Sequence, residues 1–177
     1  MSVKKTIAVL LIAVGTAFLC YFGIKTLQIR AQTKLEQTAF MPDFTIKNSV
    51  GTLFSKQNLR QSTPSVFIAF HPECEHCQYE AKSINEKQQV LNDINIVLFT
   101  TANDSITHIF SKQYGLDRLK NVHIISDTTG EIRKLLDIQI MPTILIYNAQ
   151  NQLIKRFNGE TKIEAIIKYA TPSSFEF

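Results

Sequence analysis

The sequence predicts an α/β fold in which a central mixed β-sheet is flanked by helices. The first observation is that segments with strand character alternate with segments of helical periodicity after residue 41. The second is the run Val66–Phe70, which is apolar without alternation and is typical of a strand buried on both faces. The third is the order strand, turn, strand, helix near the C-terminal end. Together they predict one sheet with helices on both faces.

A β-hairpin is expected at the start of this domain. Met41-Pro42 ends the segment before it, because the residue preceding a proline is disfavoured in the α region. Phe44–Lys47 and Thr52–Phe54 then flank residues 48–51, Asn-Ser-Val-Gly. Two short strands around such a turn are typical of a hairpin.

The buried strand Val66–Phe70 leads directly into a predicted helix. One face of this helix, extending to about residue 91, is indicated by spacings of three and four between Cys77, Ala81, Ile84, Gln88 and Leu91. Cys74 then lies where strand turns into helix. The carboxyl ends of parallel strands are where α/β sheets place their active sites.

The remaining elements continue the alternation. Glycine, threonine and apolar periodicity set their limits. We expect, in order, a strand Asn95–Thr100, a helix Ser105–Tyr114 closed by Gly115, a strand Val122–Ser126, a helix Thr128–Leu136 with a Thr cap, a hairpin of Thr143–Tyr147 and Gln152–Phe157, and a helix Lys162–Ala170.

The N-terminal end predicts a membrane anchor. Thr6–Ile24 is an uncharged stretch of 19 residues, and as a helix it would rise about 28 Å, close to the thickness of the hydrocarbon core. A cleaved signal peptide is the alternative, but no small-x-small site follows the run. Lipidation of Cys20 is a further alternative, although bulky Leu19 precedes it where a lipoprotein signal has a small residue. We therefore divide the chain into an anchor at 1–24, a polar spacer at 25–40 and a domain at 41–177.

The charge distribution argues against nucleic acid as a partner. The chain carries a net charge of +4, but from Met41 onward 14 basic and 14 acidic residues balance. The excess lies at the membrane end, so the predicted domain has no basic surface matched to a phosphate backbone.

Cys74 and Cys77 are the residues with the most specific chemistry. Cys74 falls at the helix start and Cys77 one turn later on the core-facing side, so their sulfur atoms are within reach of a disulfide. The helix dipole and unpaired N–H groups favour a thiolate on Cys74, the expected attacking sulfur. Cys77 would resolve the mixed disulfide. A zinc site would need two more ligands, and His108 and His123 do not form the usual close pair.

The chain resembles the thioredoxin-like proteins, most closely the membrane-tethered TlpA and ResA types that are grouped with the redoxins. The resemblance rests on Met41-Pro42-Asp43-Phe44, on Phe70-His71-Pro72-Glu73-Cys74-Glu75-His76-Cys77, on Glu80 and on Met141-Pro142-Thr143. It covers nearly all of the chain after Met41. It implies a thioredoxin-like fold, thiol-disulfide oxidoreductase activity and no cofactor beyond the redox-active Cys74–Cys77 disulfide.

The resemblance also assigns a substrate-binding loop. It implies a cis peptide between Met141 and Pro142, and the backbone of Met141 would pair with an extended substrate segment by strand addition. Thr143 belongs to the same loop. An ordinary trans proline at a strand start is the alternative.

Three residues of the helix are expected to tune the cysteines. Glu80 lies three residues after Cys77, so its carboxylate could exchange a proton with the sulfurs; the alternative is a solvated helix charge. A protonated His76 would stabilise a Cys74 thiolate and make the disulfide more oxidising, although the membrane-tethered relatives mostly act as reductants. Glu75 contributes specificity or surface charge.

The predicted function is exchange between the Cys74–Cys77 pair and client protein thiols and disulfides, as a reductant supplied by a thiol electron donor. Because such disulfides persist outside the cytosol, we expect a single-pass protein of the inner (cytoplasmic) membrane with a periplasmic or extracytoplasmic domain. The alternative is copper delivery by the same cysteines with His71 or His76 and with Met141. Peroxide reduction ranks third, because Phe67 and His71 stand where the peroxidase motif has Pro and Thr or Ser.

Overall fold

The computed structural model describes residues 15–16, 18–26, 39–47 and 52–171. The chain divides into two compact units, Met1–Ala39 and Phe40–Phe177. In the first unit, residues 15, 16 and 18–26 are helical. No helix within the described residues is both long enough and apolar enough to cross a bilayer. About half of the predicted span Thr6–Ile24 and most of the predicted spacer 25–40 lie outside the described ranges, so both stay predictions.

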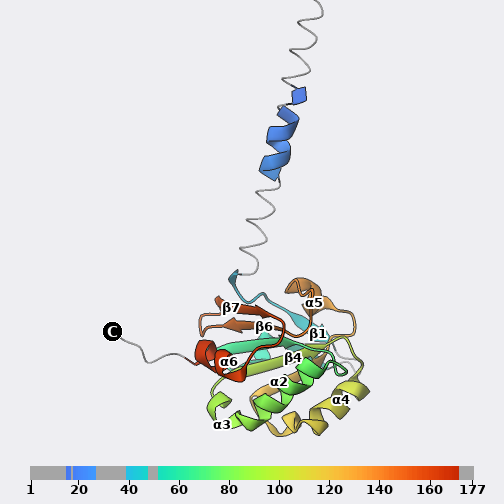
Figure 1. Ribbon diagram of the computed structural model, residues 1–177, viewed down its shortest axis with the longest axis vertical. Coiled ribbons are helices and arrows are strands. Elements are labelled where there is room, and N and C mark those ends of the chain that lie inside the picture. The colour runs from blue at the N-terminus through green and yellow to red at the C-terminus, as the bar shows by residue number, and fades with distance from the viewer. Residues whose placement is uncertain (1–14, 17, 27–38, 48–51, 172–177) are drawn as a thin grey trace, which may run out of the picture. The chain divides into compact units, whose positions relative to one another are not determined.

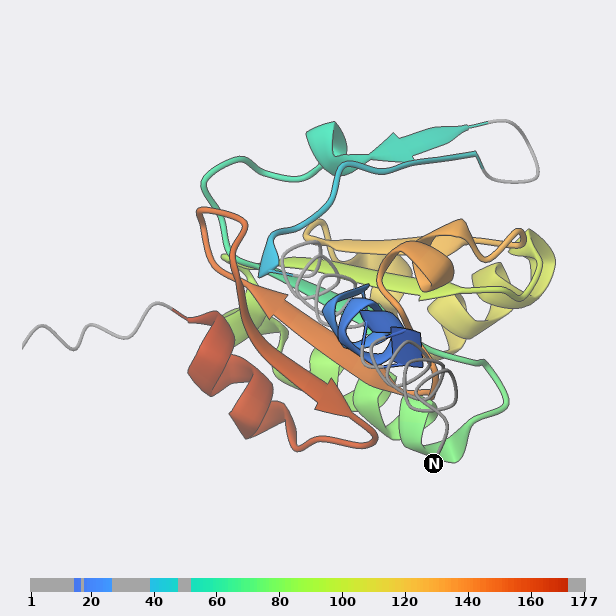
Figure 2. The same cartoon turned by 90° about the horizontal axis from the view of Figure 1, so that it is seen from above.

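The second unit is built on a five-stranded mixed sheet (Figures 1 and 2). The strand order is β5-β4-β3-β6-β7, in which β3, β4 and β5 are parallel and β6 is antiparallel to both β3 and β7. The strands are β3 Ser65–Ala69, β4 Asn95–Thr100, β5 Val122–Ser126, β6 Thr143–Tyr147 and β7 Leu153–Asn158. The predicted mixed sheet is confirmed.

Helices lie on both faces of this sheet, with α2, α3, α4 and α6 on one side and α5 on the other (Figure 1). Their bounds are α2 Glu75–Glu86, α3 Gln88–Leu91, α4 Asp104–Gln113, α5 Glu131–Leu135 and α6 Ile163–Ala170. Short 3-10 turns occupy Lys56–Asn58 and Leu116–Arg118.

The two faces of β3 account for the two hydrophobic cores. Val66 and Ile68 join the core beneath α2, α4 and α6, whereas Phe67 and Ala69 join the core beneath α5 and the N-terminal hairpin. Side chains of a strand alternate between faces, so burial on both sides requires a run without polar residues. This explains the uninterrupted apolar segment in the sequence.

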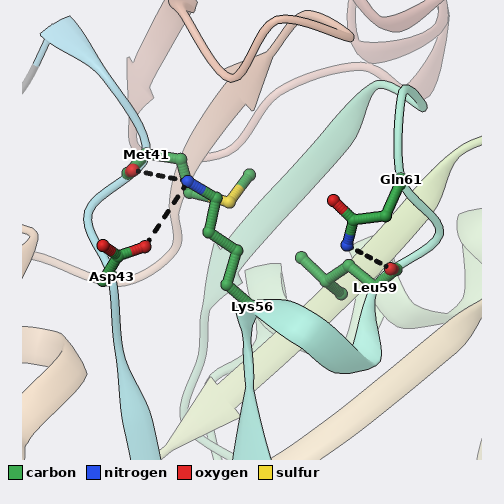
Figure 3. A network of polar contacts seen from close by, with 5 residues as sticks. All are labelled: Met41, Asp43, Lys56, Leu59 and Gln61. Atoms are coloured by element: carbon green, nitrogen blue, oxygen red, sulfur yellow. Dashed lines mark hydrogen bonds and ion pairs between the residues drawn. The ribbon is translucent and has the colours of Figure 1, made fainter.

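The predicted N-terminal hairpin is present as β1 Thr45–Lys47 and β2 Leu53–Ser55, paired antiparallel; its turn lies outside the described residues. The segment entering β1 is tied to the end of β2 by the ammonium group of Lys56, which donates to the carbonyl of Met41 at 3.3 Å and lies 3.7 Å from a carboxylate oxygen of Asp43 (Figure 3). Met41 is buried in the core beneath α5 and this hairpin.

Two details of the helices differ from the sequence prediction. The helix that follows the cysteines ends at Glu86, and Lys87 leaves helical geometry before the short α3, so Gln88 is exposed rather than part of a continuous face. The helix expected at Thr128–Leu136 begins only at Glu131, and a threonine does not cap it. The buried carboxylate of Asp127 accepts from the N–H of Glu131 at 2.8 Å and performs that role instead.

Candidate active site

The two cysteines lie where β3 passes into α2. Residues 71–74, here called the redox turn, connect the two elements, and the carbonyl of His71 accepts from the N–H of Cys74 at 3.0 Å. Cys74 is the N-cap of α2, and the side-chain amide of Gln78 donates to the carbonyl of Pro72 at 2.8 Å. These bonds fix the turn, so that Cys74 meets the positive end of the helix dipole.

The two sulfur atoms have different environments. Cys74 is partly exposed, whereas Cys77 is 1% exposed and packs in the core beneath α2. Both thiols are free in this structure. Burial, a hydrogen bond to the Cys74 sulfur and the negative charges of Cys74 and Glu80 raise the pKa of the Cys77 thiol to about 12. Cys77 therefore keeps its proton while Cys74 is the accessible sulfur, an arrangement suited to attack by Cys74.

Glu80 is buried beside this pair and is not a solvated helix charge. Its side chain is 2% exposed, and the N–H of Thr161 donates to its Oε1 atom at 3.0 Å. Oε2 is buried and has no hydrogen-bond partner. Burial, and secondarily the charge of Glu160, raise the pKa of the Glu80 carboxyl to about 7, against the lowering effect of the Thr161 hydrogen bond. A carboxyl group with such a pKa can both accept and donate a proton near neutral pH.

His76 and Glu75 lie on the exposed side of the first turn of α2. The Nδ1 atom of His76 forms an ion pair with the carboxylate of Glu160 when the imidazole is protonated. Glu75 is exposed in the first helical turn, where an acidic side chain complements the helix dipole. The sequence offered no sign of Glu160 or Thr161, since both reach α2 from the loop between β7 and α6.

The predicted substrate-binding loop lies at the same edge of the sheet as the redox turn. Ala69 at the end of β3 is paired with Thr143 at the start of β6, so the chain leaving β3 and the chain entering β6 meet there. The peptide between Met141 and Pro142 is cis, as the resemblance implied. The hydroxyl of Thr143 donates to the carbonyl of Ile140 at 2.7 Å, which holds the loop. The part these residues play in substrate binding stays a prediction.

Metal ligation was the main competing use of the cysteines. Within the described ranges, no three or more side chains of His, Cys, Asp and Glu come together in a way that could hold a metal ion. The ring centroid of His123 lies 5.1 Å from that of Phe54, and His123 is paired in the sheet with Val97. It therefore lies on β5, which β4 separates from β3, the strand that leads into the redox turn.

A mixed sheet with a Cys-x-x-Cys helix start and a cis-proline loop at the same edge defines an oxidoreductase of thioredoxin type. The chain matches the AhpC/TSA family over residues 38–156 and belongs to this family. No curated protein matches the chain at a significant level.

Solved structures of low sequence identity share the fold. A secreted disulfide oxidoreductase of Mycobacterium tuberculosis, homologous to E. coli DsbE, superimposes with a TM-score of 0.61 at 21% identity, covering 76% of this chain and 96% of that one. StoA from Bacillus subtilis gives a TM-score of 0.56 at 17% identity, covering 75% and 99%. Peroxidoxin BcpB from M. tuberculosis gives 0.60 at 14% identity, covering 74% and 90%.

Proposed function

We propose that this protein reduces disulfide bonds of client proteins outside the cytoplasm, by exchange with the Cys74–Cys77 dithiol. The observation that carries the proposal is the asymmetric pair itself, an accessible Cys74 at a helix start above a buried, protonated Cys77. A buried Glu80 supplies the matching proton acceptor.

The reaction proceeds in two exchanges. The Cys74 thiolate attacks one sulfur of the client disulfide, forms a mixed disulfide and releases the first client thiolate. Cys77 then passes its proton to the Glu80 carboxylate and attacks the Cys74 sulfur. The new Cys74–Cys77 disulfide forms as the second client thiolate leaves and takes up a proton. The client gains two electrons and the cysteine pair loses two, which a thiol electron donor restores.

The extracytoplasmic location rests on the apolar segment Thr6–Ile24 and on redox compartment. A helix over this segment would hold the chain in the cytoplasmic membrane as a single-pass protein, with residues 25–40 as the spacer. Client disulfides form and persist in oxidising compartments, so a protein that exchanges with them is expected to work there. The M. tuberculosis neighbour that shares this fold is a secreted protein.

Peroxide reduction is the second candidate, because the chain belongs to the AhpC/TSA family and shares its fold with a peroxidoxin. Counted back from Cys74, Phe67 and His71 occupy the positions of Pro and Thr or Ser in the peroxidase motif. Phe67 is buried in the core, and His71 accepts from the N–H of Glu73 through its Nδ1 atom at 3.3 Å. Neither residue supplies the hydroxyl that the motif places near a peroxide.

The substrate class is tested by presenting the reduced full-length chain, in detergent, with a disulfide-bonded protein or with hydrogen peroxide. We expect the protein disulfide to oxidise the Cys74–Cys77 pair at least about a hundredfold faster, since the buried proton acceptor serves disulfide exchange. Faster oxidation by peroxide would support the peroxidase instead. Anaerobic titration with copper(I) provides a third arm: stoichiometric binding that blocks both thiols would favour the copper-delivery alternative.

A further inference from the structure

The loop between β7 and α6 touches the redox helix at two adjacent residues. The N–H of Thr161 donates to the buried carboxylate of Glu80 at 3.0 Å, and the carboxylate of Glu160 forms the ion pair with His76. His76 and Glu80 are four residues apart, so they lie one above the other on α2. The loop therefore contacts one exposed and one buried position of the same helix face.

The buried contact determines where the exposed one forms. Glu80 is fixed in the core, and the Thr161 hydrogen bond joins the loop to it across 81 residues of sequence. At the other end of the loop, the N–H of Gly159 donates to the carbonyl of Pro142 at 2.8 Å. Glu160 lies between these two anchored residues, which places its carboxylate beside His76 without a large loss of freedom in the loop.

The position of this carboxylate changes what His76 can do. A protonated imidazole before the second cysteine would stabilise a thiolate on Cys74 and make the disulfide more oxidising. Here the Nδ1 atom of His76 lies against the carboxylate of Glu160, so a protonated imidazole pairs with that group. Because Nδ1 is engaged by this carboxylate, its proton is not available to stabilise the sulfur of Cys74.

We propose that Glu160 is a positioning residue of the redox site, which engages His76 and prevents its positive charge from stabilising the Cys74 thiolate. This inference rests on the proposed function. It assigns the direction of electron transfer to one residue, because a Cys74 thiolate that is not stabilised keeps the dithiol reducing. The histidine of the Cys-Glu-His-Cys motif then does not make this protein an oxidant.

The test is a double-mutant cycle on the full-length chain, with the equilibrium constant against glutathione measured at pH 7 for the wild type, Glu160→Gln, His76→Ala and the double variant. Glu160→Gln frees the imidazole and should make the couple more oxidising by about threefold to tenfold in this constant, or roughly 15 to 30 mV. His76→Ala alone should change it by less than about twofold, because the imidazole that it removes is held by Glu160 and gives the Cys74 thiolate little stabilisation in the wild type.

The double variant separates the role of Glu160 from a general charge effect. If Glu160 acts through His76, most of the shift caused by Glu160→Gln disappears when His76 is Ala. Glu164→Gln is the matched control, because Glu164 is an exposed glutamate in the first turn of α6, and it should leave the constant unchanged. Glu160 is also exposed, so its replacement by Gln should not impair folding.

Two results would overturn the inference: a Glu160→Gln variant with the potential of the wild type, or the same shift with and without His76. Both are independent of the proposed function, which the separate comparison of protein disulfide with peroxide tests on the wild type. A protein that reduces no client disulfide could still show the predicted coupling, and an active reductase could lack it.

Discussion

Glu80→Gln is expected to make the protein more stable at high pH and much slower in the second exchange. Burial raises the pKa of the Glu80 carboxyl from 4.5 to about 7. Because the pKa of this carboxyl is higher in the folded than in the unfolded state, its contribution to stability is full below about pH 4.5. This contribution is lost as the pH rises through about 7. The corresponding free energy is about 3 kcal/mol. Gln keeps an acceptor for the N–H of Thr161 but never becomes charged.

Urea denaturation of the reduced proteins at pH 5 and pH 8.5 measures this difference. The wild type should lose stability between the two values relative to Glu80→Gln, whereas Glu86→Gln, a replacement on the exposed side of the same helix, should follow the wild type. Equal pH dependence in the wild type and Glu80→Gln would show that the buried carboxyl does not titrate in this range.

The same variant lacks the proton acceptor for Cys77. With a model disulfide, the first attack by Cys74 should keep its rate, while resolution of the mixed disulfide should slow by about a hundredfold at pH 7. Rapid acid quenching followed by mass spectrometry separates the two steps. Slowing of the first step alone would place Glu80 in the activation of Cys74 instead.

Cys77→Ser is expected to abolish turnover and to leave the client attached to Cys74. The accessible Cys74 can still attack, but the buried position no longer carries a sulfur to complete the exchange. Non-reducing electrophoresis should show a stable mixed disulfide that a thiol reductant releases. Cys20→Ser is the matched control and should behave as the wild type, since Cys20 belongs to the other compact unit.

The trapped clients also test the compartment. When Cys77→Ser is produced in cells, the proteins recovered on Cys74 should be ones that reside outside the cytoplasm, because the proposed anchor places the domain there. Recovery of cytosolic proteins alone would contradict the proposed location. Continued turnover without a mixed disulfide would contradict the two-cysteine mechanism.

Local patterns were sufficient to predict most of the fold. The limits of β3 were predicted to within one residue and those of β4 to the residue, because burial on both faces leaves an unbroken apolar signal. The helix after the cysteines was predicted too long. Its end at Glu86 depends on how Lys87 and α3 turn back toward β4, and apolar spacing alone does not encode that turn.

The resemblance supplied the cis peptide between Met141 and Pro142, whereas spacing along the chain predicted the site only where its residues are close in sequence. Cys74, Cys77 and Glu80 share one helix, so their spacing already placed them together. Glu160 and Thr161 meet that helix through tertiary packing of the β7–α6 loop, and one glutamate before an amphipathic helix resembles any solvated charge. No local signal distinguishes Glu160, so the role predicted for His76 from the sequence did not include this ion pair.

The reduction potential of the wild-type Cys74–Cys77 pair tests the central claim most directly. It is obtained by equilibrating the full-length chain with glutathione at pH 7 and trapping the two forms with a thiol-alkylating mass tag. A dithiol that serves as a reductant, with His76 engaged by Glu160, should lie at or below roughly −220 mV, in the range between glutaredoxins and thioredoxin. A value near −120 mV, typical of a strong disulfide-forming oxidant, would contradict the account.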